Sequence, residues 1–130
     1  MQESMKQILL RYNQNIPRYT SYPPANFFTP AYSAQTAAAH LAALPAGPVS
    51  LYLHIPFCAK MCWFCGCHTR VTARYEPVVD YLDLLRTEIN LVSTHLPAGV
   101  TVNHIHFGGG SPTLLQPDDF IGLIDHLRTR

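Results

Sequence analysis

Charged residues are scarce in this sequence, and the two signs nearly cancel. Lys, Arg, Asp and Glu make up 13% of the 130 residues, about half of the share that is usual in soluble domains. The formal net charge is +1, so the sequence lacks the concentrated charge of a protein that binds nucleic acid or an anionic membrane. Hydrophobic residues reach 48%. Few charges among many apolar groups indicate that part of the surface is normally covered.

Long apolar runs are also absent. None approaches the roughly 18 residues that a transmembrane helix needs. The N-terminal stretch MQESMKQILLRYNQ lacks the apolar core and the cleavage site of a signal peptide. We therefore expect a cytoplasmic protein without a membrane span. Thiols stay reduced in that compartment, so a framework of disulfides is not expected.

Cysteine is missing everywhere except in one cysteine-rich segment, HIPFCAKMCWFCGCHTR (residues 54–70). Clustered cysteines in a reducing compartment indicate a metal site, and thiolates suit zinc or an iron–sulfur cluster. A structural zinc finger usually draws its ligands from two separate pairs, and this sequence has no second pair. A zinc loop and a reactive or disulfide-forming thiol cluster remain the alternatives. The spacing is C-x3-C-x2-C-x-C, formed by Cys58, Cys62, Cys65 and Cys67.

The remaining pattern predicts an α/β fold. An order of strand, helix, strand and helix favours a parallel sheet, in which ligands bind beyond the carboxyl ends of the strands. The cysteine-rich segment and the glycine-rich segment HFGGGSPT (residues 106–113) each follow a strand, so we expect them side by side at that edge. The predicted elements are a helix at 3–13, an extended arm without regular structure at 16–30, helices at 33–44 and 77–95, strands at 49–55 and 100–107, and a helix that begins at 117.

Apolar residues at helical spacing predict the faces that the last two helices bury. We expect these faces to form the core and not a site. They consist of Val78, Leu82, Leu85, Ile89 and Val92 in the first helix, and of Phe120, Ile121, Ile124 and Leu127 in the second.

The first three cysteines, with an aromatic residue just before the third, resemble the cluster-binding motif of the radical S-adenosylmethionine (SAM) enzymes. The resemblance implies that Cys58, Cys62 and Cys65 ligate three irons of a [4Fe–4S] cluster and that the fourth iron binds SAM. It also implies that Phe64 lies against the adenine of SAM. The alternative for Phe64 is plain packing within the loop.

Two further parts of the sequence match this family. Tyr52 matches a tyrosine that contacts SAM, although a strand tyrosine is more often a core or interface residue. The glycine-rich segment matches a loop that approaches the amino-acid end of SAM, which glycine permits because it has no side chain. A simple turn is the alternative. The residues that the resemblance implies as cofactor contacts are Tyr52, Phe64, Gly109, Gly110 and Ser111.

The stretch PRYTSYP (residues 17–23), together with the C-x-C ending at Cys65 and Cys67, resembles the oxygen-independent coproporphyrinogen III oxidases. Haem-trafficking relatives usually lack both features, and they remain the alternative. The resemblance implies oxidative decarboxylation of coproporphyrinogen III to protoporphyrinogen IX, with an electron donor whose identity the sequence does not reveal. It also implies an N-terminal arm and helix (1–48) followed by the first two βα units (49–130) of a partial, TIM-like barrel, monomeric at full length.

Two strands alone make a poor parallel sheet, because both faces and both edges need cover. We therefore expect the chain to be the first part of a longer protein, with the main substrate residues beyond Arg130. We expect the 130 residues alone not to sustain turnover. An inert truncated product is the alternative.

Several other polar residues in the segments described above are expected to have ordinary roles. Cys67 is expected not to ligate the cluster. For His54 two roles stay open, namely a local structural hydrogen bond and a supporting role near the cluster. We expect packing or solvated positions, not metal or substrate contacts, for His104, His106, Arg70, Arg74, Arg18 and Tyr22.

Overall fold

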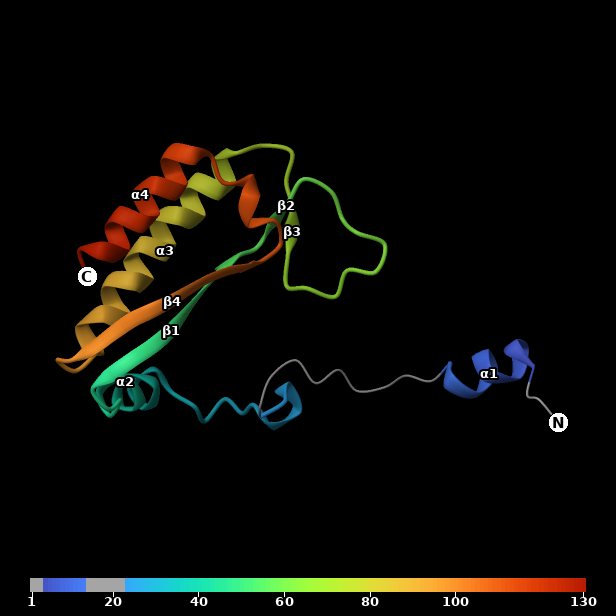
Figure 1. Ribbon diagram of the computed structural model, residues 1–130, viewed down its shortest axis with the longest axis horizontal. Helices are drawn as coiled ribbons and strands as arrows, with labels where there is room; N and C mark the ends of the chain where they lie inside the picture. The colour runs from blue at the N-terminus through green and yellow to red at the C-terminus, as the bar shows by residue number, and fades with distance from the viewer. Residues whose placement is uncertain (1–3, 14–22) are drawn as a thin grey trace. The chain divides into compact units, whose positions relative to one another are not determined.

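A computed structural model of the chain describes residues 4–13 and 23–130 (Figure 1). Arg18, Tyr22 and most of PRYTSYP lie outside these ranges, so the expectations for them stay predictions. The chain divides into two compact units, Met1–Ser33 and Ala34–Arg130. The expected division into residues 1–48 and 49–130 also stays a prediction. Over the part of the chain that the structure describes, no helix is both long and apolar enough to cross a membrane.

The first unit contains helix α1 (Met5–Tyr12) and the 3-10 helix η1 (Ala25–Phe27). A capping box begins α1: the Ser4 N–H donates to Oε1 of Gln7 over 2.9 Å, and the Gln7 N–H donates to Oγ of Ser4 over 3.4 Å. The predicted helix at 3–13 is thereby confirmed. The prediction that the arm lacks regular structure is wrong over η1, where one turn follows two prolines.

The second unit is built on two parallel strands, β1 (Gly47–Ile55) and β4 (Val100–Gly109). Helix α3 (Glu76–His95) connects them, because parallel strands require a crossover. The register runs from Gly47 opposite Val100 to Ile55 opposite Gly109, with one irregularity between Val49 and Ser50. This confirms the predicted α/β fold with parallel strands, although each strand is two residues longer than predicted.

Helix α4 (Pro117–Arg128) follows β4 after the 3-10 helix η2 (Pro112–Leu114), and α3 and α4 pack against each other (Figure 1). The Ala-rich helix α2 (Ala34–Ala42) packs against α3. Helices α3 and α4 cover the apolar side of the sheet, which Leu53 and Ile55 provide.

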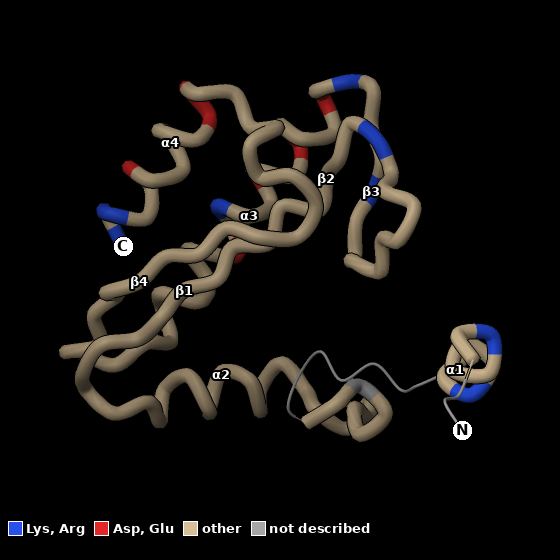
Figure 2. The backbone as a smooth tube through the Cα atoms, turned by 45° about the vertical axis from the view of Figure 1, so that its right-hand side comes forward, with Lys and Arg blue, Asp and Glu red and all other residues tan. Residues whose placement is uncertain are grey.

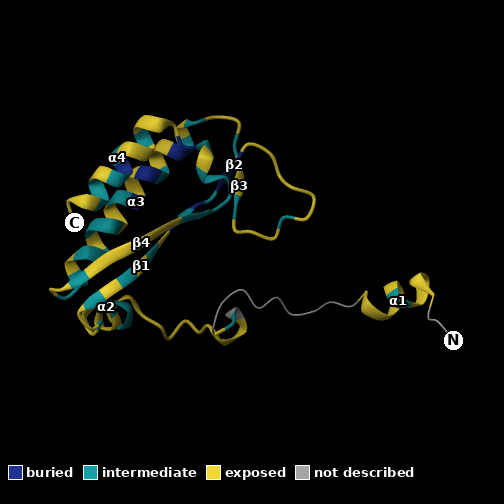
Figure 3. Cartoon of the chain, in the orientation of Figure 1, coloured by how far each residue is buried: buried dark blue, intermediate teal, exposed yellow. Residues whose placement is uncertain are grey.

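The core lies between that side of the sheet and the two long helices (Figure 3). Full burial of an aliphatic side chain contributes about 1.5–3 kcal/mol. Among the described residues, four side chains are fully buried, namely Ile55, Val78, Leu82 and Leu123. The predicted face of α3 is confirmed at Val78, Leu82 and Leu85, which are all buried.

The predicted face of α4 is partly wrong. Leu123, which the prediction left out, is the one buried residue of α4, whereas Ile121 is 57% exposed. Successive residues of a helix are 100° apart, so Ile121 lies about 200° from Leu123 and points away from the core. The buried stripe is centred on Leu123 and continues one turn later to Leu127, which packs against the core. Phe120, one turn before Leu123, is 40% exposed, so the prediction is also wrong there.

A small second ladder closes the cysteine-rich segment. Strands β2 (Phe57–Cys58) and β3 (Arg70–Val71) pair in parallel. The Arg70 N–H donates to the Pro56 carbonyl over 2.6 Å, and the Thr72 N–H donates to the Cys58 carbonyl over 3.0 Å. Residues 59–69, which we call the cysteine loop, project from this ladder (Figure 1). Two-residue strands are too short to show an alternating pattern, so the sequence did not predict them.

Candidate functional site

The cysteine-rich and glycine-rich segments meet at the carboxyl edge of the main sheet, as predicted. The Gly110 N–H donates to the Ile55 carbonyl over 2.8 Å, and the Ser111 N–H donates to the Phe57 carbonyl over 2.7 Å. These bonds extend the β1–β4 ladder beyond its last pair. The backbone after β4 is therefore held against the strand that leads to the first cysteine.

Neighbouring side chains and backbone approach the glycines of this segment closely. A Cβ on Gly108 would lie 2.6 Å from the hydroxyl oxygen of Tyr52. Gly109 has φ +110°, and a Cβ there would lie 2.9 Å from the ring of His54. A Cβ on Gly110 would collide with the Phe57 carbonyl oxygen. A simple turn does not describe the whole glycine-rich segment, because Gly108 and Gly109 belong to strand β4.

Cys58 is the fixed member of the cysteine set. Its side chain is buried, and its Sγ lies 3.3 Å from Oγ1 of Thr69 and 3.7 Å from Oγ of Ser111. The Thr69 hydroxyl donates to the Pro56 carbonyl over 3.2 Å, so its oxygen is free to accept from the Cys58 thiol. Ser111 donates toward the sulfur. The predicted cluster ligand and the predicted cofactor contact are thus neighbours.

The other three cysteines lie in the cysteine loop as free thiols. Cys62 and Cys67 are exposed, and Cys65 is half-buried. Within residues 4–13 and 23–130, no three His, Cys, Asp or Glu side chains lie close enough to hold a metal ion. The donor chemistry nevertheless fits an iron–sulfur cluster, because reduced thiols are soft ligands and those of Cys62 and Cys65 are accessible without disturbing the core.

Phe64 and its neighbour Trp63 point into solvent. Their exposed fractions are 89% and 104%, so Phe64 does not pack within the loop. Figure 3 shows that most of this loop is exposed. Aromatic side chains in such positions are available to cover a ligand or partner, and sequence analysis had not singled out Trp63.

A polar and aromatic layer covers the side of the sheet opposite the core. The Tyr52 hydroxyl lies 3.1 Å from Nδ1 of His54, and Nε2 of His54 lies 2.8 Å from the His68 carbonyl. A carbonyl can only accept, so Nε2 of His54 donates to His68, and Nδ1 is left to pair with the Tyr52 hydroxyl. The Tyr52 ring also stacks on His106, with centroids 5.7 Å apart. Tyr52 is 55% exposed, so it is not a core residue.

His54 therefore has the local hydrogen-bonding role that was one of its two expected roles. It connects β1 to the end of the cysteine loop through the backbone of His68. His104, by contrast, is exposed and lies 3.0 Å from the side chain of Asn103.

Charge around the cysteine loop has a single sign. Residues 59–75 contain Lys60, Arg70 and Arg74 but no Asp or Glu, and all three cations are exposed. Figure 2 shows these basic positions along the loop and β3, while the acidic ones lie on the helices. The solvated positions expected for Arg70 and Arg74 are confirmed. Their charges make the surroundings favourable for carboxylate groups.

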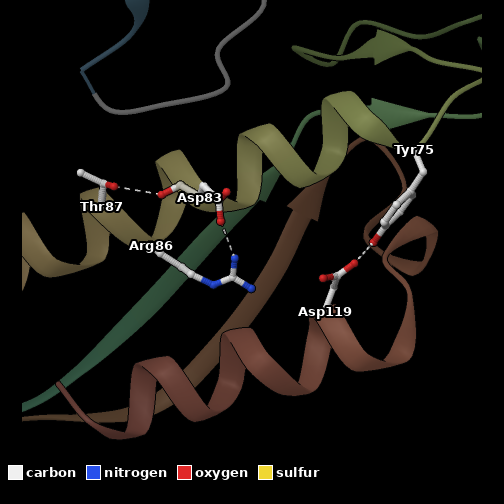
Figure 4. A network of polar contacts seen from close by, with 5 residues as sticks. All are labelled: Tyr75, Asp83, Arg86, Thr87 and Asp119. Atoms are coloured by element: carbon white, nitrogen blue, oxygen red, sulfur yellow. Dashed lines mark hydrogen bonds and ion pairs between the residues drawn. The ribbon is translucent and has the colours of Figure 1, made fainter.

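Two tyrosines that sequence analysis missed anchor the site. Tyr75 precedes helix α3, and Tyr81 lies within it. The Tyr81 hydroxyl donates to the His54 carbonyl over 2.5 Å, and its ring meets Phe57 edge-on. The Tyr75 hydroxyl donates to Oδ2 of Asp119 over 2.6 Å (Figure 4) and accepts from the Gln116 N–H over 2.9 Å. Burial raises the pKa of both phenols above 10.0, and Asp119 adds to the effect on the pKa of Tyr75. The only available signal was that buried tyrosines need a partner.

Comparison with known proteins gives consistent matches, although no family model matches the chain. It is 48% identical over 116 residues to the oxygen-independent coproporphyrinogen III oxidase of Bradyrhizobium diazoefficiens, covering 88% of this chain and 26% of that protein. It is 41% identical over 121 residues to the protein of the same name from Mannheimia haemolytica, covering 93% of this chain and 82% of that one. The chain thus spans about a quarter of the first relative's length.

A solved structure extends this likeness to the fold. Coproporphyrinogen III oxidase (HemN) from Escherichia coli, described as a radical SAM enzyme, superposes with a TM-score of 0.78 at 39% identity. The match covers 94% of this chain and 26% of that one. The fold and the cysteine spacing therefore define the opening part of a radical SAM enzyme domain. More particularly, the chain belongs to the oxygen-independent coproporphyrinogen III oxidase family.

Proposed function

We propose that this chain forms the part of an oxygen-independent coproporphyrinogen III oxidase that binds a [4Fe–4S] cluster and SAM. Family membership supports the class of reaction. The observation that carries the proposal is the contact between Cys58 and Ser111, because it joins the cysteine-rich segment to the glycine-rich segment at the carboxyl edge of the sheet. Ligands of such folds bind at that edge.

In this proposal Cys58, Cys62 and Cys65 are the cluster ligands. Cys58 sits on β2 with its sulfur held by two hydroxyls, so it offers a preorganised first ligand. Cys62 and Cys65 lie on the exposed loop and complete the set. When bound, the cluster and SAM supply the one-electron radical chemistry, and the protein supplies ligands, orientation and shielding.

The proposed SAM contacts are distributed around the same edge. Phe64 is free to cover the adenine, because its side chain packs on nothing in the loop. Tyr52 presents an exposed ring beside Gly108. The backbone of Gly109 and Gly110 and the hydroxyl of Ser111 would meet the amino-acid end of SAM.

For the whole protein we propose coproporphyrinogen III as substrate, an electron donor of unassigned identity as partner, and the cytoplasm as location. The names of the relatives support the substrate. The cytoplasm is proposed because cluster ligation needs reduced cysteines, which persist in a reducing compartment.

The test is anaerobic reconstitution with iron and sulfide, followed by reduction and electron paramagnetic resonance with and without SAM. We expect a [4Fe–4S] signal that changes when SAM is added. The Cys65→Ser variant should lose the signal, and the matched Cys67→Ser variant should keep it. A cluster that forms equally well in both variants would contradict the ligand set. A signal that never responds to SAM would contradict the cofactor site.

A further inference from the structure

Two of the cysteines in the cysteine loop, Cys62 and Cys65, lie close together in the backbone. Cluster binding alone does not require this proximity. The Cys65 N–H donates to the Cys62 carbonyl over 3.1 Å. This bond between residues i and i+3 makes a β-turn with Trp63 and Phe64 at its two central positions. The two cysteines are therefore at the two ends of one turn.

The backbone spacing across this turn is compatible with a disulfide. The Cα atoms at the ends of a β-turn are less than about 7 Å apart, and disulfides join Cα atoms that are about 4.4–6.8 Å apart. The loop carries no regular structure between β2 and β3, so a small adjustment of two side chains does not disturb the core. A bond between Cys62 and Cys65 is compatible with the fold as it stands.

Accessibility separates these two thiols from the first cysteine. Cys62 is exposed and Cys65 is half-buried, whereas Cys58 is only 8% exposed. Two hydroxyls hold the Cys58 sulfur, and β2 fixes its backbone in the ladder with β3. A small reagent in solution therefore reaches Cys62 before it reaches Cys58.

Cys67 is the other exposed thiol, and it is a poorer partner. Among the described hydrogen bonds, no backbone bond closes Cys65 onto Cys67. Only Gly66 separates these residues, and glycine adds conformational freedom at that point. The turn at Cys62 therefore selects which pair forms.

We infer that Cys62 and Cys65 form a reversible disulfide in the metal-free chain and that this bond controls cluster assembly. The control of cluster assembly rests on the proposed function, because the disulfide would make two of the three proposed cluster ligands unavailable to iron. The reacting partner is a low-molecular-weight disulfide. Reduction of the pair then restores the thiols that bind iron.

The exchange balances with glutathione disulfide as the oxidant. The Cys62 sulfur attacks one sulfur of glutathione disulfide and releases one glutathione thiol, which leaves a mixed disulfide. The Cys65 sulfur then attacks the Cys62 sulfur and releases the second glutathione. Two electrons pass from the protein dithiol to glutathione disulfide, and the two thiol protons end on the two glutathione products.

The experiment uses the metal-free 130-residue chain, reduced and then freed of reductant under anaerobic conditions. It is incubated with glutathione disulfide, quenched in acid, alkylated and mapped by peptide mass spectrometry. We expect two of the four thiols to be lost and a peptide linked through Cys62 and Cys65. The Cys67→Ser and Cys58→Ser variants should form the same link. Cys62→Ser should form none.

Iron uptake is the second readout. The oxidised chain should lose its capacity to incorporate iron and sulfide, and dithiothreitol should restore it. The inference would be overturned if all four thiols stayed free in excess glutathione disulfide. It would also be overturned if the main disulfide involved Cys58 or Cys67. If the link forms but even the reduced chain takes up no cluster, the disulfide site stands while the control of assembly and the proposed function both fail.

Discussion

The main-chain N–H of Gly110 donates a hydrogen bond to the carbonyl oxygen of Ile55 over 2.8 Å. Ile55 is the last residue of β1, and its side chain is fully buried in the core. This bond therefore ties the glycine-rich segment to one of the best-packed positions of the sheet. The proposed SAM contacts owe their position to that attachment, because Gly109 and Ser111 flank the bonded residue.

The attachment predicts a cost for any side chain at Gly110. In the Gly110→Ala variant the new methyl group meets the backbone carbonyl of Phe57, which cannot move without disturbing β2. We expect the free energy of unfolding to fall by about 1–3 kcal/mol, as overpacking usually costs. Urea denaturation followed by circular dichroism measures the change.

Gly122 in α4 is the matched control for this substitution. A Cβ there meets only a guanidinium nitrogen of Arg86 at 3.7 Å, an ordinary contact. Alanine also favours a helix interior over glycine, so Gly122→Ala should stabilise the chain by about 0.5–1 kcal/mol. Equal effects at the two positions would show that close approach to Phe57 does not govern Gly110.

The buried stripe of α4 gives a second prediction. Leu123 is fully buried, while Ile121 is 57% exposed. Leu123→Ala should lower the free energy of unfolding by about 2–5 kcal/mol through lost burial and a cavity. Ile121→Ala should change it by about 0.5 kcal/mol or less. Comparison of the two denaturation midpoints distinguishes this arrangement from the predicted one, in which the buried face included Ile121 and left out Leu123.

That error illustrates which features the sequence could predict. Strands, helices and the meeting of the two loops follow from local patterns and from the direction of parallel strands, and they were predicted correctly. The stripe on α4 was misplaced because four apolar residues within five positions fit several helical faces equally well. Tyr81 could not be assigned a role, because its partner at His54 is distant in sequence and is a backbone atom. The two-residue ladder of β2 and β3 depends on tertiary pairing alone.

The phenol of Tyr75 predicts a dependence of stability on pH. Burial, and then Asp119, raise its pKa above 10.0 in the folded chain. The folded state therefore holds this proton more tightly than the unfolded state, so the contribution to stability is present below about pH 10 and is lost as the pH rises further. Tyr75→Phe should flatten the decline of the unfolding free energy above pH 10. An unchanged slope in this variant would contradict the assignment.

The same variant should also lose stability at neutral pH. Phenylalanine leaves Oδ2 of Asp119 and the Gln116 N–H without the partner that Tyr75 provides. Loss of such a hydrogen bond typically costs about 1 kcal/mol. Asp119→Asn keeps an acceptor for the phenol and should cost less. Thermal denaturation of the two variants at pH 7 makes the comparison, and a larger loss for Asp119→Asn would argue that the ion, and not the phenol, secures this end of α4.

Thr69 predicts how firmly the first cysteine is held. Its hydroxyl donates to the Pro56 carbonyl and lies 3.3 Å from the Cys58 sulfur. Valine has the same shape without the hydroxyl, so Thr69→Val should loosen the base of the cysteine loop and expose Cys58 more often. We expect faster alkylation of Cys58 by iodoacetamide, followed residue by residue with mass spectrometry. Thr101→Val, at an exposed position of β4, is the control and should leave the rate unchanged. If Cys58 reacts equally slowly in both variants, the β2–β3 ladder alone protects its sulfur.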